Sequence, residues 1–461
     1  MKPPRVSLIA LTRDRPREFR VLLDALRYQR MRDFELIVVG ERPKVTDHGA
    51  PKDAADRLTY LTCAEENISL SRNIGLSHAS GDVIAFIDDD AAPEPDWLEE
   101  LLKPFETADV GAVGGYVRGR NGVDFQWRGA IVDRYGAHFP VDAQDLAQRN
   151  LSDPKGEFFL STVGVNSAFR RKALMKIGGF DENFHYFLDE SDVCIRMLAA
   201  GWRTVMAPQA EVHHAYAESQ ERSSNRAPRD LFQIAASRTY FGLIHGDPDW
   251  FGQKLAQFQH DQRKRLKKFV QLGRLSRRQA AWIAGRMEEG CAVGAARFDD
   301  GPRIGETLTK RRRGNWTPYA SSHRARPLRV ALAAAEPWRR RVYRLGERLA
   351  AEGCEVSVID FSLSARRLNV EFRDGVWRHV GGVLGRESFH KTLSAPRRCL
   401  KVKRELDRIS QRRSPDVIVR PGAQKYRIGG EQTVAMRGWL PGFVAEPLRP
   451  GAAAQLLDYL A

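Results

Sequence analysis

A short apolar segment that runs directly into three aspartates constrains this chain more than any other stretch. Val83 to Ile87 is a continuous apolar run of the kind that fills a buried parallel strand, and Asp88, Asp89 and Asp90 follow without a spacer. Adjacent carboxylates repel one another, so a fold that keeps three of them at a strand end needs a compensating cation. Oxygen ligands favour hard divalent ions, so the segment predicts a site for Mn²⁺ or Mg²⁺. The plainer alternative is a solvated acidic turn after a core strand.

Alternating apolar periodicity predicts an α/β fold around this segment. Strands are expected over residues 5–11, 34–39, 57–61, 83–87 and 110–117, and helices over 18–27, 67–77 and 96–107. Strands joined by helical crossovers pair in parallel, so the aspartates would lie at the carboxyl edge of a sheet, where ligands bind in open α/β folds.

Three further segments accompany the aspartates in a fixed order. Arg72-Asn73-Ile74-Gly75 precedes the aspartate-bearing strand, Gly178-Gly179-Phe180-Asp181-Glu182 forms a predicted turn, and Asp189-Glu190-Ser191-Asp192 begins a predicted helix. Over roughly the first 245 residues the chain thus resembles the family-two glycosyltransferases. The resemblance implies a GT-A fold, a Rossmann-like mixed sheet. It also implies a metal-dependent, inverting hexosyltransferase-type enzyme that moves a sugar from a nucleotide-diphosphate sugar to an acceptor hydroxyl, as in surface polysaccharide or glycoconjugate synthesis.

The resemblance also assigns roles to individual residues. The residues that would border the nucleotide sugar are Thr12, Arg13, Glu41, Arg72, Asn73, Asp88 and Asp89. The cation would be held by Asp88, Asp90 and a histidine, His213 in preference to His214. The catalytic carboxylates would be Glu190, Asp189 and Asp192, and Asn166 and Gly179 would lie on the acceptor side. Without the resemblance, Arg72 would be interpreted as an exposed helix cation.

Two departures from the family pattern affect these roles. Gly40 stands where the family usually has an aspartate that binds the base, which leaves the identity of the base open. The first pair of the late acidic cluster is inverted, as Asp189-Glu190. We expect Glu190 to accept the proton of the acceptor hydroxyl, with Asp189 as its nearest rival.

A chain of 461 residues exceeds one ordinary core, so further domains are expected. We predict a GT-A domain over residues 1–250, a basic helical segment and linker over 251–327, and a small Rossmann-like domain over 328–461. Residues 118–158 of the first domain would be a mobile acceptor-side loop. In the second segment, a capping box at Ser276 and Gln279 would start a helix that ends near Met287, and the linker would begin at residue 299. The third domain would contain strands from residues 329, 355 and 416 and a helix over 397–410. This domain resembles the N-terminal half of a GT-B glycosyltransferase at low specificity. It has no room for the nucleotide-binding half and lacks GxGxxG, so a docking or acceptor-side role is expected.

The net charge of +16 is concentrated in runs such as 263–268, 310–313 and 339–341. These runs would form solvated helix faces or attract an anionic membrane or nucleic acid. We expect a glycan or lipid-linked acceptor, peripheral contact with an anionic membrane, and no nucleic-acid partner.

Five scattered cysteines, no apolar stretch of 18 residues and no leader-like segment predict a cytoplasmic protein, peripheral at most at the inner face of the membrane. Two alternatives stay open at this point: a nucleotidyltransferase that makes the sugar nucleotide, and a non-catalytic basic scaffold for RNA or membrane.

Overall fold

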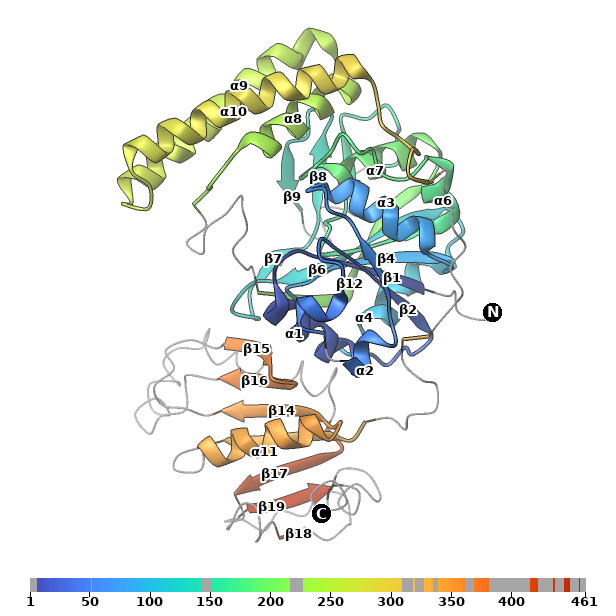
Figure 1. Cartoon of the computed structure of the whole chain (residues 1–461), viewed down its shortest axis with the longest axis vertical. Helices are drawn as coiled ribbons and strands as arrows, with labels where there is room; N and C mark the ends of the chain where they lie inside the picture. The colour runs from blue at the N-terminus through green and yellow to red at the C-terminus, as the bar shows by residue number, and fades with distance from the viewer. Residues whose placement is uncertain are drawn as a thin grey trace.

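The structure is a computed structural model that describes residues 6–50, 52–141, 151–215, 227–308, 318–319, 327–334, 339–360, 369–380, 415–421, 434–435, 443–447 and 456. A large mixed sheet with flanking helices forms the N-terminal part, a long helical hairpin projects from it, and a second mixed sheet forms the C-terminal part (Figure 1).

The N-terminal sheet has nine strands in the order β3-β2-β1-β4-β11-β6-β12-β5, with β7 paired to β6. Their bounds are β1 Val6–Thr12, β2 Phe34–Gly40, β3 Thr59–Thr62, β4 Val83–Asp88, β5 Ala91–Pro93, β6 Val110–Arg118, β7 Phe125–Trp127, β11 Asn166–Arg170 and β12 Arg203–His214. Strands β1 to β4 are parallel, whereas β11 runs antiparallel between β4 and β6. The α/β class and the position of the aspartates at the carboxyl edge of the parallel strands are therefore as the sequence predicted.

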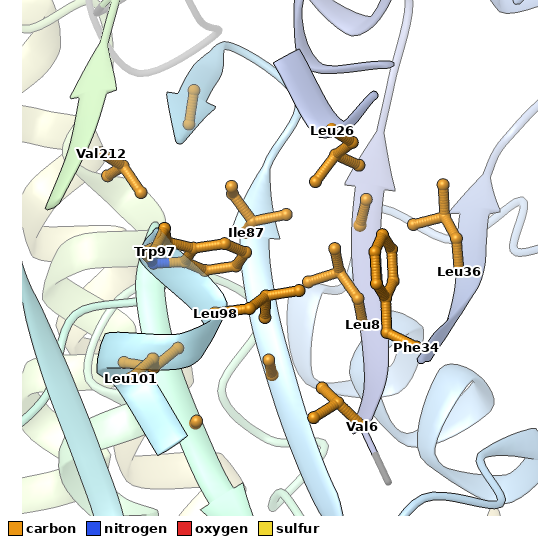
Figure 2. Close-up of a cluster of buried hydrophobic side chains, with 14 of the residues drawn as sticks. Val6, Leu8, Leu26, Phe34, Leu36, Ile87, Trp97, Leu98, Leu101 and Val212 are labelled. Carbon is orange, nitrogen blue, oxygen red and sulfur yellow. The ribbon is translucent and has the colours of Figure 1, made fainter. Parts of the chain in front are cut away.

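Apolar strands and one face of each flanking helix form the core of this sheet. Figure 2 shows one layer, in which Leu8, Phe34 and Ile87 of three strands meet the helical residues Leu26, Trp97 and Leu98. The indole Nε1–H of Trp97 donates a hydrogen bond to Asn166 Oδ1 at 2.8 Å, so the buried ring has its polar atom satisfied. The helices around the sheet are α1 Pro16–Leu26, α2 Lys52–Ala55, α3 Ile68–His78, α4 Trp97–Leu102, α6 Arg171–Lys176 and α7 Asp189–Ala199, with 3₁₀ turns η1 Val45–His48 and η2 Lys103–Glu106.

A three-stranded antiparallel sheet lies between the large sheet and the helical hairpin. It consists of β8 Ala130–Asp133, β9 His138–Pro140 and β10 Phe158–Ser161 in the order β10-β8-β9. The sequence predicted only an irregular acceptor-side loop here, because these strands are short and separated by polar residues.

The helices that follow are α8 Phe232–His245, α9 Pro248–Gln271 and α10 Arg277–Asp300. The sequence predicted that α10 would end near Met287, but it continues for three more turns. It does so because Gly290 and Gly294 let its backbone contact α8 at Phe232 and Ala236, where a Cβ would clash. The capping box of Ser276 and Gln279 that the sequence predicted is present at its start.

Residues 301–308 return to the N-terminal domain, although the sequence predicted a linker beginning at residue 299. The Glu182 N–H donates to Arg303 O at 3.0 Å, and Thr307 Oγ1–H donates to Glu182 Oε1 at 2.6 Å. Leu308 is buried in the core below α3 and α7. This segment therefore closes the Gly178–Glu182 turn from outside.

The C-terminal sheet has seven strands in the order β15-β16-β14-β13-β17-β19-β18. Their bounds are β13 Arg329–Ala334, β14 Glu355–Asp360, β15 Asn369–Arg373, β16 Val376–Val380, β17 Val417–Pro421, β18 Val434–Ala435 and β19 Phe443–Pro447; α11 Arg339–Ala351 joins β13 and β14. Strands β16, β14, β13 and β17 are parallel and the edge strands are antiparallel. The predicted strands near 329, 355 and 416 are present, and the helix predicted over 397–410 lies outside the described residues.

The β15–β16 hairpin docks this sheet onto the N-terminal domain. Val370, Phe372 and Trp377 form a small buried cluster with Ala25 and Tyr28 of α1 and its end, and with Ala92 of β5. The Val370 N–H donates to Asn121 O at 2.9 Å in the turn between β6 and β7. Gly122 in that turn has φ of +64°, and a Cβ there would clash with Val370 O.

Within the described residues, no helix is both long enough and apolar enough to cross a membrane.

Candidate active site

A cleft of about 830 Å³ opens at the carboxyl edge of the N-terminal sheet. The strand register explains its position, because Leu11 pairs with Asp88 and Thr12 pairs with Gly40, so three strands end at the same level. Among the residues that line the cleft are Thr12, Arg13, Arg15, Gly40, Glu41, Asn67, Ser71, Asp88, Asp89, Asp90, His214, Arg229, Trp282 and Arg286. Five residues predicted to contact the nucleotide sugar, Thr12, Arg13, Glu41, Asp88 and Asp89, are therefore brought together.

Asp88, Asp90 and His214 form a cluster that could hold a divalent cation. One ligand atom from each lies within 4.8 Å of the others, and His214 Nε2 is 3.0 Å from Asp90 Oδ1. Two carboxylates and one imidazole suit Mn²⁺, which accepts nitrogen ligands more readily than Mg²⁺ does. The donor set therefore fits the cation that the sequence predicted.

The structure places His214 in this cluster, whereas the sequence predicted His213 in preference. Successive side chains of a strand point to opposite faces, and β12 pairs with β5 so that His214 is opposite Ala91, next to Asp90. His213 faces the other way, where its Nε2 lies 2.8 Å from Glu94 Oε1 and its ring lies 4.8 Å from that of Trp377. The sequence could not show this alternation, because the pairing of β12 with β5 joins residues about 120 positions apart.

Gln126 of β7 orients the imidazole of His214. Its Oε1 lies 3.1 Å from Nδ1, and this contact turns the other ring nitrogen, Nε2, toward Asp90, where a cation would be held. Desolvation by the cleft walls raises the pKa of Asp88, although 39% of its side chain stays exposed, and His214 opposes that rise. Nothing in the sequence around Gln126 indicated this role.

Asp89 points away from the cluster toward the first strand. It accepts a hydrogen bond from Thr12 Oγ1–H at 3.0 Å and one from Arg15 at 3.2 Å. Burial raises the pKa of Asp89 to about 7, against the opposing charge of Arg15. Arg15, which also lies 3.7 Å from Asp90, was missed by the sequence analysis even though it stands three residues after Thr12.

Glu41 and Arg13 form the side of the cleft nearest β2. Glu41 accepts the Asp14 N–H at 2.8 Å and lies 3.9 Å from Arg13, whose guanidinium also donates to Glu65 O. Gly40 allows a close approach here, because a Cβ would lie 2.5 Å from the hydroxyl of Tyr60, which would have to move. The glycine that departs from the family pattern thus leaves room for Tyr60 to pack beneath this part of the cleft.

Arg72 joins the two carboxylates of the late acidic cluster. Its guanidinium is 2% exposed, pairs with Asp189, and lies 2.7 Å from Glu190 Oε1. Gly164 passes directly over the pair of Arg72 and Glu190, where any side chain would clash. In the structure Arg72 therefore holds carboxylates and does not line the cleft, which differs from the predicted contact with a diphosphate.

Glu190 is the more accessible of the two carboxylates. Its side chain is 14% exposed and that of Asp189 is 1% exposed. Phe187 and Leu188, just before the pair, both have left-handed backbones, with φ of +71° and +68°. Such conformations are costly for residues with a Cβ, so the fold, and not local preference, sets the position of Glu190.

Four other predicted site residues are buried in structural networks. Asn73 bonds to Phe180 and Glu182, and Asn166 bonds to Tyr116, Ala210 and Trp97. Asp192 accepts from Arg196 and His245. Burial raises the pKa of Asp192, but the charge of Arg196 and the hydrogen bond from His245 outweigh that rise, so the pKa falls below its ordinary value. Gly179 has φ of +76°, and its carbonyl accepts from Arg196. Asn73, Asp192, Asn166 and Gly179 are thus engaged in these networks and are not among the residues that line the cleft, and their predicted roles stay predictions.

Trp377 of the C-terminal sheet is expected to support the cation cluster through His213. Trp377→Ala would remove the ring that packs against His213 and loosen the strand end that carries His214. We expect Mn²⁺ affinity to fall about 10-fold, at the low end of the effect of losing outer-shell partners. A titration followed by electron paramagnetic resonance measures this. Trp377→Phe should recover most of the affinity; equal affinity in the alanine variant and the unaltered chain would refute the coupling.

Comparisons with known proteins match the N-terminal half of the chain. The family described as "Glycosyltransferase like family 2" matches residues 4–232. The chain is 31% identical over 226 residues to a glucosyl-dolichyl phosphate glucuronosyltransferase of Haloferax volcanii, covering 46% of this chain and 69% of the relative. It is also 31% identical over 259 residues to the O-antigen biosynthesis protein RfbC of Myxococcus xanthus, covering 53% of this chain but only 20% of that protein.

One of the similar solved structures is that of a mannosyltransferase from Pyrobaculum calidifontis in complex with GDP-Man and Mn²⁺. It is 17% identical, with a TM-score of 0.40, and the match covers 64% of this chain and 88% of that chain. The family match and the Haloferax volcanii relative, of which the match covers 69%, agree with the order of the motifs and with the sheet described above. The chain is therefore a glycosyltransferase with a GT-A domain and belongs to glycosyltransferase family 2.

Proposed function

We propose that this chain transfers a sugar from a nucleotide-diphosphate sugar to an acceptor hydroxyl, with inversion at the anomeric carbon. The observation that carries the proposal is the position of Glu190 beside the Asp88–Asp90–His214 cluster. Glu190 and Arg72 pack against Gly164, two residues before Asn166, and Asn166 pairs with Ile87, the residue before Asp88. The two carboxylate groups therefore lie at the same end of β4. The family assignment favours a transferase over the nucleotidyltransferase and the scaffold that the sequence left open.

The donor would lie in the cleft with its diphosphate at the aspartates. Asp88, Asp90 and His214 would hold Mn²⁺ or, less suited to the imidazole, Mg²⁺. When bound, the cation supplies positive charge that stabilises the leaving diphosphate. Arg15 and Arg13, at the mouth of the same cleft, can add charge-assisted hydrogen bonds to phosphate oxygens, and Glu41 lies where the base or ribose would be bound.

Glu190 would act as the general base. Its carboxylate accepts the proton of the acceptor hydroxyl while that oxygen forms a bond to the anomeric carbon. The bond from this carbon to the diphosphate breaks, and its electron pair leaves with the nucleotide. Attack from the face opposite the diphosphate gives inversion. Arg72 keeps Glu190 oriented, and the other nitrogen of its guanidinium pairs with the buried carboxylate of Asp189.

The acceptor would be a glycan or a lipid-linked saccharide, and the reaction would belong to surface polysaccharide or glycoconjugate synthesis. Two relatives support this class: one is named for action on a dolichyl phosphate sugar, the other for O-antigen biosynthesis. We place the protein in the cytoplasm, in peripheral contact with the inner face of the membrane.

Nucleotide binding tests the proposal most directly. The thermal unfolding midpoint of the full chain would be measured with UDP, GDP or dTDP, each with and without Mn²⁺. We expect one diphosphate to raise the midpoint by a few degrees only when Mn²⁺ is present, because a ligand at about 100 times its dissociation constant adds about 2.7 kcal/mol of stability. Stabilisation that is independent of both the base and the metal would contradict a nucleotide-sugar donor site.

A further inference from the structure

The end of the α9–α10 hairpin concentrates positive charge more than any other part of the described chain. Residues 262–287, here called the hairpin tip, contain no Asp or Glu. The tip carries nine cations: Arg263, Lys264, Arg265, Lys267, Lys268, Arg274, Arg277, Arg278 and Arg286. All of them except Arg286 are exposed. The hairpin projects away from both sheets, so this charge is displayed on a protrusion (Figure 1).

Exposed apolar side chains accompany this charge. Leu272, in the turn between the helices, is 54% exposed, and Trp282 is 56% exposed. Neither is needed to hold the hairpin together, because the seam between the helices is filled by other residues, among them Phe258, Leu266, Ile283 and Met287. An apolar side chain at a basic tip is a feature of surfaces that insert shallowly into a lipid headgroup layer.

The hairpin is packed against the transferase domain next to the donor cleft. Trp282 and Arg286 of α10 line that cleft, and Arg286 pairs with Asp230 at 3.1 Å, just before α8. The glycine contacts between α10 and α8 fix the base of the hairpin on the transferase. A surface bound by the tip would therefore lie at a set position relative to the cleft mouth.

We propose that the hairpin tip binds an anionic lipid bilayer and holds the cleft at the bilayer surface. The positive charge supplies long-range attraction to anionic headgroups, and Leu272 supplies a shallow apolar anchor. This inference rests on the proposed function in one respect, because the benefit of such binding is access to an acceptor anchored in lipid. The binding itself requires no transfer reaction and is tested separately.

Lipid fits the tip better than nucleic acid. A groove that follows a phosphate backbone interleaves cations with aromatic rings that stack on bases. The exposed apolar residue in the turn is instead an aliphatic leucine, which has no ring for stacking. The ring of Phe269 next to the turn is half-buried, and the guanidinium groups of Arg265 and Arg274 already lie over it, at 5.7 and 6.0 Å from its centroid. Trp282 lies farther along α10 at the cleft.

Vesicle sedimentation with the full chain tests this inference. Vesicles of phosphatidylcholine with 30% phosphatidylglycerol would be compared with phosphatidylcholine alone. We expect binding to the anionic vesicles only, with affinity falling as NaCl rises. Lys267→Glu combined with Lys268→Glu should lower the partition coefficient more than about 10-fold, since each basic residue near the surface contributes appreciably. Leu272→Asp should lower it further at high salt.

Matched controls keep the test decisive. Arg340→Glu combined with Arg344→Glu makes the same change of net charge on exposed positions of α11 and should leave vesicle binding unchanged. Mn²⁺-dependent nucleotide binding should be intact in all these variants, so failure of the lipid proposal is distinguishable from failure of the transferase proposal. The proposal is overturned if the full chain ignores anionic vesicles at low salt. It is also overturned if the chain binds single-stranded RNA more tightly than anionic vesicles and Leu272→Asp changes neither the affinity for RNA nor the affinity for vesicles.

Discussion

Glu190→Gln is expected to lower turnover by roughly 10²–10⁴-fold while leaving the affinities for Mn²⁺ and for the nucleotide nearly unchanged. The amide keeps the size of the side chain, and its oxygen can still accept the hydrogen bond from Arg72 that spans 2.7 Å in the structure. What is lost is the ability to take the acceptor proton. Steady-state transfer rates, measured beside a nucleotide titration, separate the chemical step from donor binding.

Asp189→Asn is the matched control for this experiment. Asp189 is buried against Arg72, so its neutralisation should lower the thermal unfolding midpoint and disturb Glu190 indirectly. A chain that is well folded yet inactive after Asp189→Asn, together with a mild effect of Glu190→Gln, would mean that the base has been assigned to the wrong member of the pair.

Asp90→Asn should abolish metal-dependent nucleotide binding and, with it, transfer. Asp90 lies just after β4, is almost fully buried and faces His214, so its neutralisation removes one of the two negative charges that would hold the cation. The substitution keeps the shape of the side chain, and the fold should persist by circular dichroism. Calorimetric titration with Mn²⁺ provides the measurement, and unchanged turnover at saturating Mn²⁺ would falsify the cation assignment.

The two adjacent histidines allow a sharper version of this test. His214→Ala should weaken Mn²⁺ binding by more than about 100-fold, beyond the 10–100-fold cost of losing an outer-shell partner. His213→Ala should weaken it by no more than about 10-fold, because His213 contacts Glu94 and Trp377 on the opposite face of the strand. The reverse order of effects would restore the assignment that sequence alone favoured.

Local patterns were sufficient to predict the elements that organise this site. The apolar run before Asp88 predicted a buried strand, and Thr12, Arg13 and Glu41 were predicted at strand ends that the sheet brings together. These predictions depend on residues close in sequence and on the general rule that parallel strands end at one edge.

The remaining errors concern side-chain direction and burial. Which histidine faces the aspartates depends on the register of β12 against β5, and Gln126 acquires its role only through the β6–β7 pairing. Arg72 and Asn73 lie next to each other in an apparently functional motif, yet both point into the protein toward α7 and the Gly178–Glu182 turn. Burial of this kind is set by elements more than 100 residues away, which periodicity does not reveal.

The return of residues 301–308 has a consequence for where a minimal transferase can end. Thr307 bonds to Glu182, Glu182 bonds to Asn73, and the residue before Asn73 on α3 is Arg72, which bonds to Glu190. A gene cut after the codon for Gly301 would therefore remove a brace for the catalytic carboxylate, although every residue of the cleft would remain. The hairpin precedes this brace in the chain and also lines the cleft through Trp282 and Arg286, so a chain that ended at the boundary the sequence suggests near residue 250 would lose both. The length and the charge of the hairpin tip can change in evolution, but both ends of the hairpin must stay packed on the same transferase domain.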